Sequence, residues 1–163
     1  MGDIMKIYII GPSGSGKTTL SKKLSKKYKI KTYELDCLVY DDENGHVKRN
    51  DDEIDKLFNK ILNSKSWIIE DVGRDRFNKG LIECDRIYYL KISKFRVYLR
   101  VMKRWFKQRI GVEKYNYPPT LFQFFDMIRV AREYYKKEYK KLEKLQEYSD
   151  KVIYLSYKDL DSF

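Results

Sequence analysis

The chain has 163 residues, of which 42% are hydrophobic and 36% charged, and its formal net charge is +11. This length is sufficient for a sizeable core and fits one domain spanning residues 1–163. No run of about 18 apolar residues occurs, so we expect no membrane span and no membrane partner. The N-terminus leads directly into an apolar run and the only cysteines are Cys37 and Cys84. We therefore expect a cytoplasmic protein without a signal peptide, whose cysteines are reduced core residues.

Hydrophobic patterning and turn residues predict strands that alternate with helices along the whole chain. The predicted strands are 5–10, 31–35, 67–69, 86–92 and 152–155, and the predicted helices are 17–28, one starting after Asn50, 94–109 and 121–147. Asn44-Gly45 predicts a turn, and Gly111–Pro119 breaks the two long helices apart. This alternation is typical of an α/β fold with a parallel sheet covered on both faces.

The two long helices are both predicted to be amphipathic. The first is expected to place Phe95, Tyr98, Met102, Trp105 and Arg109 along one side, with Arg100, Lys103, Arg104 and Lys107 on or near the other. The second is expected to bury Leu121, Phe125, Ile128, Ala131, Tyr135, Leu142 and Leu145.

The most specific motif lies between the first strand and the first helix. Residues 11–18, Gly-Pro-Ser-Gly-Ser-Gly-Lys-Thr, match G-x-x-x-x-G-K-[ST] at every fixed position. In such a loop, backbone N–H groups hold phosphate oxygens, Lys17 adds a positive charge for the β- and γ-phosphates, and the Thr18 hydroxyl ligates Mg²⁺. A dinucleotide-binding turn fits less well, because the glycine spacing differs and Lys17 would have no role. We therefore predict ATP and Mg²⁺ as cofactors, bound by Gly11, Ser13, Gly14, Ser15, Gly16, Lys17, Thr18 and Thr19, although capping or packing is the more ordinary role for Thr19.

Further candidates follow the predicted strands, because ligands bind at the carboxyl ends of strands in open parallel sheets. Asp36 is a candidate catalytic base or ligand of a Mg²⁺-bound water, and a turn cap is the alternative. Glu70 is the candidate second metal-site residue, with Asp71 as its competitor, because strand alternation points the two to opposite faces. Arg74 is a candidate for binding the acceptor, and the alternative is a surface arginine paired with Asp71 or Asp75.

The C-terminal half carries most of the positive charge. Residues 91–148 contain 16 Lys or Arg and 6 Asp or Glu. The arginines that flank the helix break suggest a lid, approximately residues 100–132, that closes over a triphosphate. For each arginine taken alone, the alternative is a solvent-exposed residue on the helix surface with no role in the site. From this set we take Arg104 and Arg109 as catalytic candidates and Arg129 and Arg132 as acceptor-binding candidates, whereas Arg100 and His46 receive no assigned role.

Taken together, these residues resemble the adenylate-kinase-like branch of P-loop kinases, and within it the FlaR-like DNA topology modulation family. The resemblance depends on the 11–18 loop and on the segments 35–38, 67–70 and 84–90, and it weakens after about residue 110. It implies a three-layer P-loop fold with a five-stranded parallel sheet in the order 2-3-1-4-5 and a small helical lid. Nucleoside monophosphate kinases carry Asp-Gly-x-Pro-Arg after the third strand, where this chain has Glu-Asp-Val-Gly-Arg at residues 70–74. The arginine is kept and the rest is not, so a nucleotide acceptor does not follow.

Two functions are compatible with the sequence. The first is a kinase that transfers the γ-phosphoryl group of ATP–Mg²⁺ to a small, nucleoside- or nucleotide-like acceptor. The alternative is a nucleotide-dependent DNA-binding regulator with little or no turnover, whose binding through the basic half would weaken steeply with salt. A GTPase is not expected, because no Asn-Lys-x-Asp follows a strand, and neither is an ABC- or AAA-type motor, because the chain is short and lacks their signature segments.

Overall fold

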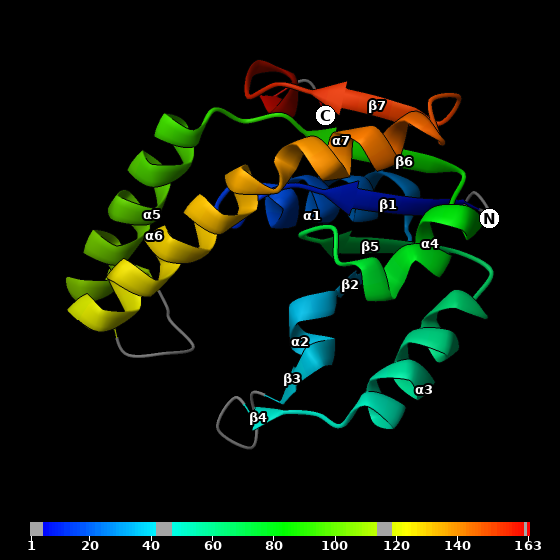
Figure 1. Cartoon of the computed structure of the whole chain (residues 1–163), viewed down its shortest axis with the longest axis horizontal. Coiled ribbons are helices and arrows are strands. Elements are labelled where there is room, and N and C mark those ends of the chain that lie inside the picture. The colour runs from blue at the N-terminus through cyan, green and yellow to red at the C-terminus, as the bar shows by residue number, and fades with distance from the viewer. Residues whose placement is uncertain (1–4, 42–46, 114–118, 162) are drawn as a thin grey trace.

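A computed structural model of the chain describes residues 5–41, 47–113, 119–161 and 163 (Figure 1). Its main sheet contains five parallel strands in the spatial order β2-β5-β1-β6-β7. In chain order this arrangement is 2-3-1-4-5, so the predicted topology is confirmed. The strands are β1 (Lys6–Ile10), β2 (Thr32–Glu34), β5 (Trp67–Asp71), β6 (Arg86–Leu90) and β7 (Val152–Leu155).

Helices cover both faces of this sheet, as expected for a three-layer α/β fold. The longer helices are α1 (Lys17–Tyr28), α3 (Asp51–Leu62), α5 (Lys94–Arg109), α6 (Leu121–Lys136) and α7 (Glu138–Gln146). The shorter elements are α2 (Leu35–Val39), α4 (Asn78–Glu83), the 3-10 turns η1 (Asp75–Phe77) and η2 (Lys158–Asp161), and the antiparallel pair β3 (Tyr40–Asp41) and β4 (Val47–Lys48). The predicted boundaries of α1 and α5 are confirmed, and Asn50 caps α3 by accepting the Glu53 N–H at 2.8 Å.

The central strand β1 shows how the sequence builds two cores. Successive side chains of a strand point to opposite faces, and both faces of a parallel sheet are buried. Ile7 and Ile9 therefore face α1 and α5, whereas Tyr8 and Ile10 face α3, α4 and α7. In Figure 1, α4 and α7 lie in front of the sheet and α1 lies behind it.

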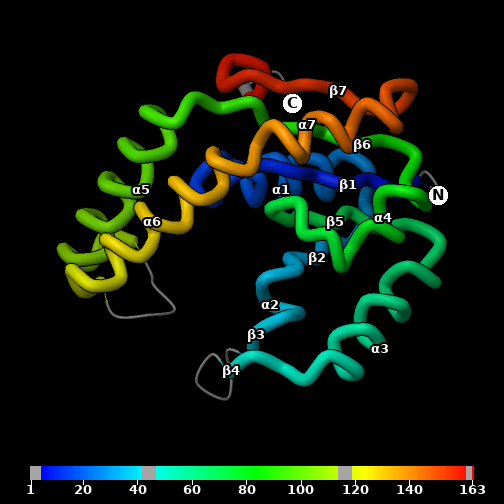
Figure 2. Tube along the Cα trace, in the orientation of Figure 1, coloured from blue at the N-terminus to red at the C-terminus, as the bar shows by residue number. Residues whose placement is uncertain are grey.

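The predicted helix 121–147 is in fact two helices, which corrects the sequence-based expectation. They meet at Lys137, whose backbone (φ −104°, ψ 3°) leaves the helical region. Figure 2 shows that α6 packs beside α5, away from the sheet, whereas α7 passes in front of the strands. The interruption lets α6 pack against α5 while α7 packs against the sheet. No glycine or proline marks this position in the sequence. The helical turns over residues 75–83 were not predicted either.

The predicted inner side of the helix 121–147 is confirmed at Ala131 and Leu145, but several larger apolar side chains of α5 and α6 are exposed. Phe95 is 70% exposed and Phe125 is 64% exposed, and Met102 and Leu121 are exposed as well. The buried side chains of α5 are instead Val97, Val101 and Gln108. Periodicity identifies a helix but does not say which stripe faces the sheet, and here the hairpin extends beyond the sheet (Figure 1).

Smaller expectations have mixed outcomes. Cys84 is buried as predicted, but Cys37 is exposed, because α2 packs on the core through Leu35, Leu38 and Val39 and leaves Cys37 outside. Asn44-Gly45 and His46 lie outside the described residues. Within the described ranges, no helix combines the length and the apolar character needed to cross a membrane.

Candidate functional site

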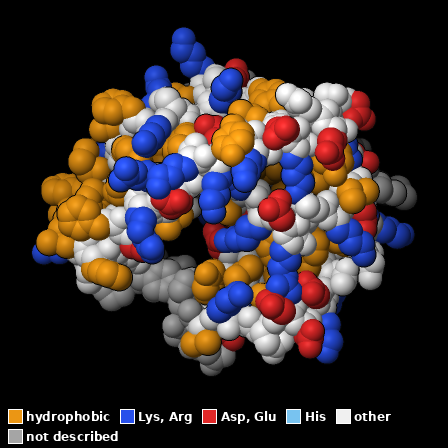
Figure 3. Space-filling view, in the orientation of Figure 1, with side chains coloured by type: hydrophobic (Ala, Val, Ile, Leu, Met, Phe, Trp, Pro, Cys, Tyr) orange, Lys and Arg blue, Asp and Glu red, His pale blue; other side chains and the backbone are white. Residues whose placement is uncertain are grey.

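The carboxyl ends of the strands face a cleft of about 620 Å³, a volume typical of small-molecule sites. Figure 3 shows the surface hollowed between the α5–α6 hairpin and the rest of the molecule, with basic side chains on its rim. The cleft is lined by residues of the phosphate-binding loop, α1, α5, α6 and the segment after β7. They are Ser13, Gly14, Gly16, Lys17, Thr18, Thr19, Lys22, Lys23, Glu34, Arg100, Val101, Arg104, Glu113, Met127, Tyr157 and Leu160.

The loop between β1 and α1 depends on two glycines with positive φ. Gly14 has φ 77° and Gly16 has φ 103°, a region that other residues rarely adopt. A Cβ on Gly14 would also lie 3.4 Å from Val101 of α5. The glycines therefore shape the loop and let α5 approach it closely.

The Lys17 ammonium lies within this loop and is buried. Its Nζ donates to the carbonyl oxygens of Gly11 at 2.9 Å and Pro12 at 3.0 Å. Burial lowers the pKa of Lys17, while the carboxylates of Glu70, Asp36 and Asp71 oppose that shift. The ammonium is thus held by neutral carbonyl groups, which an anionic phosphate can replace as a stronger partner.

Six of the eight predicted loop residues line the cleft, whereas Gly11 and Ser15 do not. The Ser15 hydroxyl is buried and has no hydrogen-bond partner among the described residues. A Cβ on Gly11 would lie 2.8 Å from that hydroxyl oxygen, so Gly11 makes room for it. Ser15 and Gly11 therefore shape the loop from within, and any contact that they make with a ligand comes from the backbone.

Glu70 is joined to the start of α1. The Thr18 hydroxyl donates to Glu70 Oε2 at 3.0 Å, and the Ser21 hydroxyl donates to Oε1 at 3.1 Å. Burial raises the pKa of Glu70 to about 7, with the Glu34 carboxylate adding to the shift. A hydroxyl and a carboxylate are the oxygen donors that Mg²⁺ takes beside nucleotide phosphates, so Thr18 and Glu70 fit the predicted metal site.

Asp71 lies on the other face of the sheet and organises Arg74. Its buried carboxylate accepts the N–H groups of Gly73 at 2.7 Å and Arg74 at 2.6 Å, and the Arg74 guanidinium at 2.5 Å. The same guanidinium also donates to Asp36, whose side chain is 56% exposed. Arg74 therefore pairs with Asp71, as the alternative to acceptor binding predicted. It also contacts Asp36, which follows the neighbouring strand β2.

Of the arginines on the hairpin, Arg100 and Arg104 line the cleft. Arg100 donates to the carbonyl oxygens of Ser15 at 2.5 Å and Gly14 at 3.3 Å, which ties α5 to the loop. Arg104 lies one helical turn further along the same face, 3.5 Å from Glu113.

The other three predicted arginines lie outside the cleft. Arg109 is five residues beyond Arg104 and therefore on a different side of α5, where it packs over the Trp105 ring at 5.5 Å. Arg129 pairs with Asp126 in the preceding turn of α6. Arg132 is exposed and does not line the cleft.

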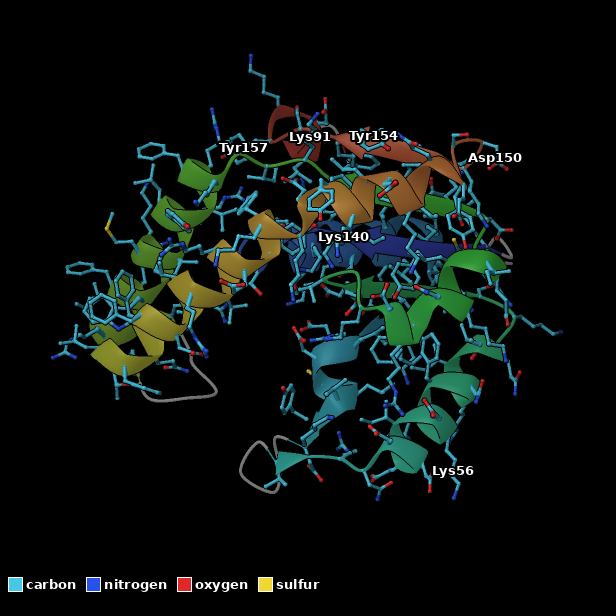
Figure 4. The ribbon with its side chains drawn as sticks, in the orientation of Figure 1. Lys56, Lys91, Lys140, Asp150, Tyr154 and Tyr157 are labelled. Atoms are coloured by element: carbon cyan, nitrogen blue, oxygen red, sulfur yellow. The ribbon has the colours of Figure 1, made fainter. Side chains whose placement is uncertain are left out.

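Tyr157 and Leu160 line the cleft and were missed by the sequence analysis. The Tyr157 ring lies 4.9 Å from the Arg96 guanidinium and 4.7 Å from that of Arg100, and Figure 4 shows it beside the first turns of α5. Both residues follow β7, so the rule that ligands bind at the carboxyl ends of strands would have found them.

The fold and this loop define a P-loop protein with a helical hairpin beside the cleft at its phosphate-binding loop. A family model described as an AAA domain, AAA_18, matches residues 7–116, more than half of the chain. The chain therefore belongs to this family. The P-loop class is confirmed, and the expectation that the chain is no AAA-type motor stays a prediction.

Two solved structures illustrate the fold. A gluconokinase from Sinorhizobium meliloti 1021 is 14% identical, with a TM-score of 0.56, and the match covers 96% of this chain and 84% of that one. A shikimate kinase from Bacteroides thetaiotaomicron is 16% identical, with a TM-score of 0.52, and the match covers 92% of this chain and 84% of that one. A search of curated proteins finds no match. The chain thus has the fold of small-molecule P-loop kinases.

Proposed function

We propose that this chain is a small-molecule kinase, a single domain over residues 1–163, which transfers the γ-phosphoryl group of ATP to a hydroxyl group of its acceptor. The observation that carries the proposal is the Thr18–Glu70 hydrogen bond at the phosphate-binding loop, beside a cleft of nucleotide size. That pair offers the donors of a nucleotide-bound metal, and the loop offers those for phosphate.

ATP binds with its phosphates against the loop N–H groups. Lys17 then exchanges the carbonyl oxygens of Gly11 and Pro12 for oxygens of the β- and γ-phosphates. Tyr157 and Leu160 supply aromatic and apolar surface for the purine base. Thr18 and Glu70 would hold Mg²⁺, which would neutralise charge on the phosphates of the bound nucleotide.

The acceptor lies on the side of Asp36 and Arg74. Asp36 is exposed, so its carboxylate can reach and deprotonate the attacking hydroxyl, while the neighbouring Arg74 binds the acceptor. Asp71, which is buried beneath, fixes the orientation of the guanidinium. Positioning of the two substrates is the main contribution to the rate.

The lid, about residues 100–132, completes the site. Arg104 already lines the cleft and stabilises the charge on the transferred group. Arg109, Arg129 and Arg132 take part only if the hairpin moves, because they lie outside the cleft in this conformation. Closure over the cleft excludes water, which would otherwise hydrolyse ATP.

Among the P-loop kinases, we place this chain in the adenylate-kinase-like branch, within its FlaR-like topology modulation family. We propose that it acts in the cytoplasm. The segments 35–38, 67–70 and 84–90 support it beside the phosphate-binding loop. The acceptors for which the two structural neighbours are named belong to those proteins, and they motivate including small hydroxy acids among the acceptors tested.

The test is a phosphoryl-transfer screen with γ-labelled ATP against nucleosides, nucleotides, sugars and hydroxy acids, with Lys17→Met as the control. We expect labelled product with at least one acceptor and none with the variant. Product that survives in Lys17→Met contradicts the mechanism. No product from any acceptor, together with tight and salt-sensitive DNA binding, favours the DNA-binding regulator instead.

A further inference from the structure

A second cavity, of about 120 Å³, lies between α7 and the segment that follows β5. It is on the Ile10 side of the sheet, opposite the side on which Val101 and Leu160 pack beside the nucleotide cleft. Its lining includes Ile10 and Gly73, which immediately precede Gly11 of the phosphate-binding loop and Arg74. The cavity therefore adjoins both halves of the proposed active site without belonging to the nucleotide cleft.

Four lysines concentrate positive charge at this cavity. The cavity is lined by Lys137, Lys140, Lys141 and Lys144. The last three lie three, four and seven residues after Lys137, so all four lie on one side of α7. Figure 4 shows Lys140 on α7, where that helix passes in front of the sheet. The cavity thus has a basic wall built by one helix.

The compensating negative charge is small. Asp75 is the lining carboxylate, and it pairs with Lys144 at 2.9 Å. Across the described ranges, no carboxylate lies within 4.0 Å of the ammonium groups of Lys137, Lys140 or Lys141. Among the described residues, these three cations therefore have no carboxylate at ion-pair distance.

Lys141 is the most constrained of the three. Its Nζ donates to the Gly73 carbonyl oxygen at 2.5 Å and lies 5.2 Å from the centre of the Tyr134 ring. Burial lowers the pKa of Lys141, while the carboxylates of Asp71 and Asp75 oppose that shift. A Cβ on Gly73 would lie 3.2 Å from this Nζ, so the glycine lets the lysine reach the turn. The ammonium keeps donor capacity beyond its one carbonyl partner, since it has three N–H groups.

We propose that this lysine-lined cavity binds an anionic group of the phosphoryl acceptor, so that the acceptor is a small molecule with both a hydroxyl and a carboxylate or phosphate group. The inference rests on the proposed kinase function. The cavity is about one fifth of the volume of the nucleotide cleft, which suits an anionic group and not a second nucleotide. Neutral sugars and nucleosides lack the group that the lysines recognise and are poor acceptors.

Binding is tested first without ATP. Protein with ¹³C-labelled lysine side chains is titrated with inorganic phosphate and, separately, with malonate, in the Lys17→Met background to remove binding at the loop. We expect saturable shifts of the Lys141 and Lys140 signals and none at Lys56, an exposed lysine of α3. Equal, unsaturable shifts of all lysines overturn the site. The two ligands distinguish a phosphate site from a carboxylate site.

Turnover is tested with matched acceptor pairs that differ in charge: sugar acid and alditol, and sugar phosphate and sugar. We expect transfer to the charged member of a pair. Lys141→Met and Lys140→Met should each raise its KM by about tenfold, the cost of roughly one ion pair, with the KM for ATP unchanged. Lys56→Met is the matched control, with no change expected.

The outcomes separate the two claims. No product from any acceptor contradicts the proposed function, whatever the lysine signals show. Product from neutral and charged members at equal rates, or an acceptor KM that neither lysine substitution alters, overturns the anion site while the kinase function stands. The use of two variants ensures that misfolding of one does not decide the result.

Discussion

The Thr18 hydroxyl lies 3.0 Å from Oε2 of Glu70, although the two residues are 52 positions apart in the chain. The contact joins the first turn of α1 to the end of β5, a strand that pairs directly with β1. A hydroxyl and a carboxylate this close together are oxygen donors that suit a nucleotide-bound Mg²⁺. The proposed kinase site depends on this contact.

Substitution Glu70→Gln should change how stability depends on pH. Burial raises the pKa of Glu70 to about 7 in the folded protein, from 4.5 in an unperturbed chain. Between those values the folded state binds more protons than the unfolded state, so the free energy of unfolding falls as pH rises. At pH 8 without Mg²⁺, Glu70→Gln should be more stable than wild type by about 1–3 kcal/mol, and the difference should vanish near pH 4.

Urea unfolding in EDTA at several pH values measures this difference. Glu143→Gln, at an exposed position of α7, is the control and should follow wild type. An unfolding free energy that changes with pH equally in wild type and Glu70→Gln would show that Glu70 titrates as an ordinary carboxyl group.

Asp71 should be a positioning residue for Arg74. Asp71→Asn removes the charge from a buried group that accepts three hydrogen bonds, so we expect a loss of about 1–3 kcal/mol in the free energy of unfolding. Asp71→Asn and Arg74→Met should be non-additive, because each removes the same ion pair. Denaturant titration of the single and double variants measures the coupling, with exposed Asp150→Asn as the control. Additive effects would rule out the pairing.

Tyr157 should contribute to nucleotide affinity. Tyr157→Leu removes the ring that lines the cleft between Arg96 and Arg100, and we expect ATP binding to weaken about tenfold, as for the loss of one aromatic contact. Tyr154→Leu is the control, since Tyr154 packs against Tyr89 outside the cleft. Titration calorimetry with ATP compares the two, and equal affinities would remove Tyr157 from the site.

The two catalytic candidates on α5 should differ. Arg104→Met should lower kcat by about tenfold or more, because Arg104 lines the cleft and its charge acts on the transferred group. Arg109→Met should have the smaller effect, because its guanidinium packs over Trp105. Steady-state kinetics at saturating ATP decides between them. A larger loss in Arg109→Met would mean that the hairpin rearranges during turnover.

The parts of the site that are local in the sequence could be predicted from it. The 11–18 motif, the capping residue Asn50 and the opposite orientation of Glu70 and Asp71 each follow from residue type and spacing, and the structure shows the last two directly. The strand order came from the resemblance and is confirmed.

Other parts depend on contacts between distant segments and could not be predicted. Lys137 interrupts a helical pattern that has no breaking residue, at the point where the chain passes from packing beside α5 to packing over the sheet (Figure 2). Val97 and Val101 form the buried side of α5 in place of its larger apolar residues, because the helix packs close to the phosphate-binding loop. The lysine-lined cavity likewise exists only once α7 meets the turn at Gly73.

Titration calorimetry of the wild-type chain and Lys17→Met with ATP and Mg²⁺ tests the central claim most directly. The account predicts saturable binding of one ATP per chain in wild type and an affinity lower by about a hundredfold or more in Lys17→Met, because the lysine contacts the β- and γ-phosphates. Absence of binding in wild type for both ATP and GTP, or equal binding by Lys17→Met, would contradict it.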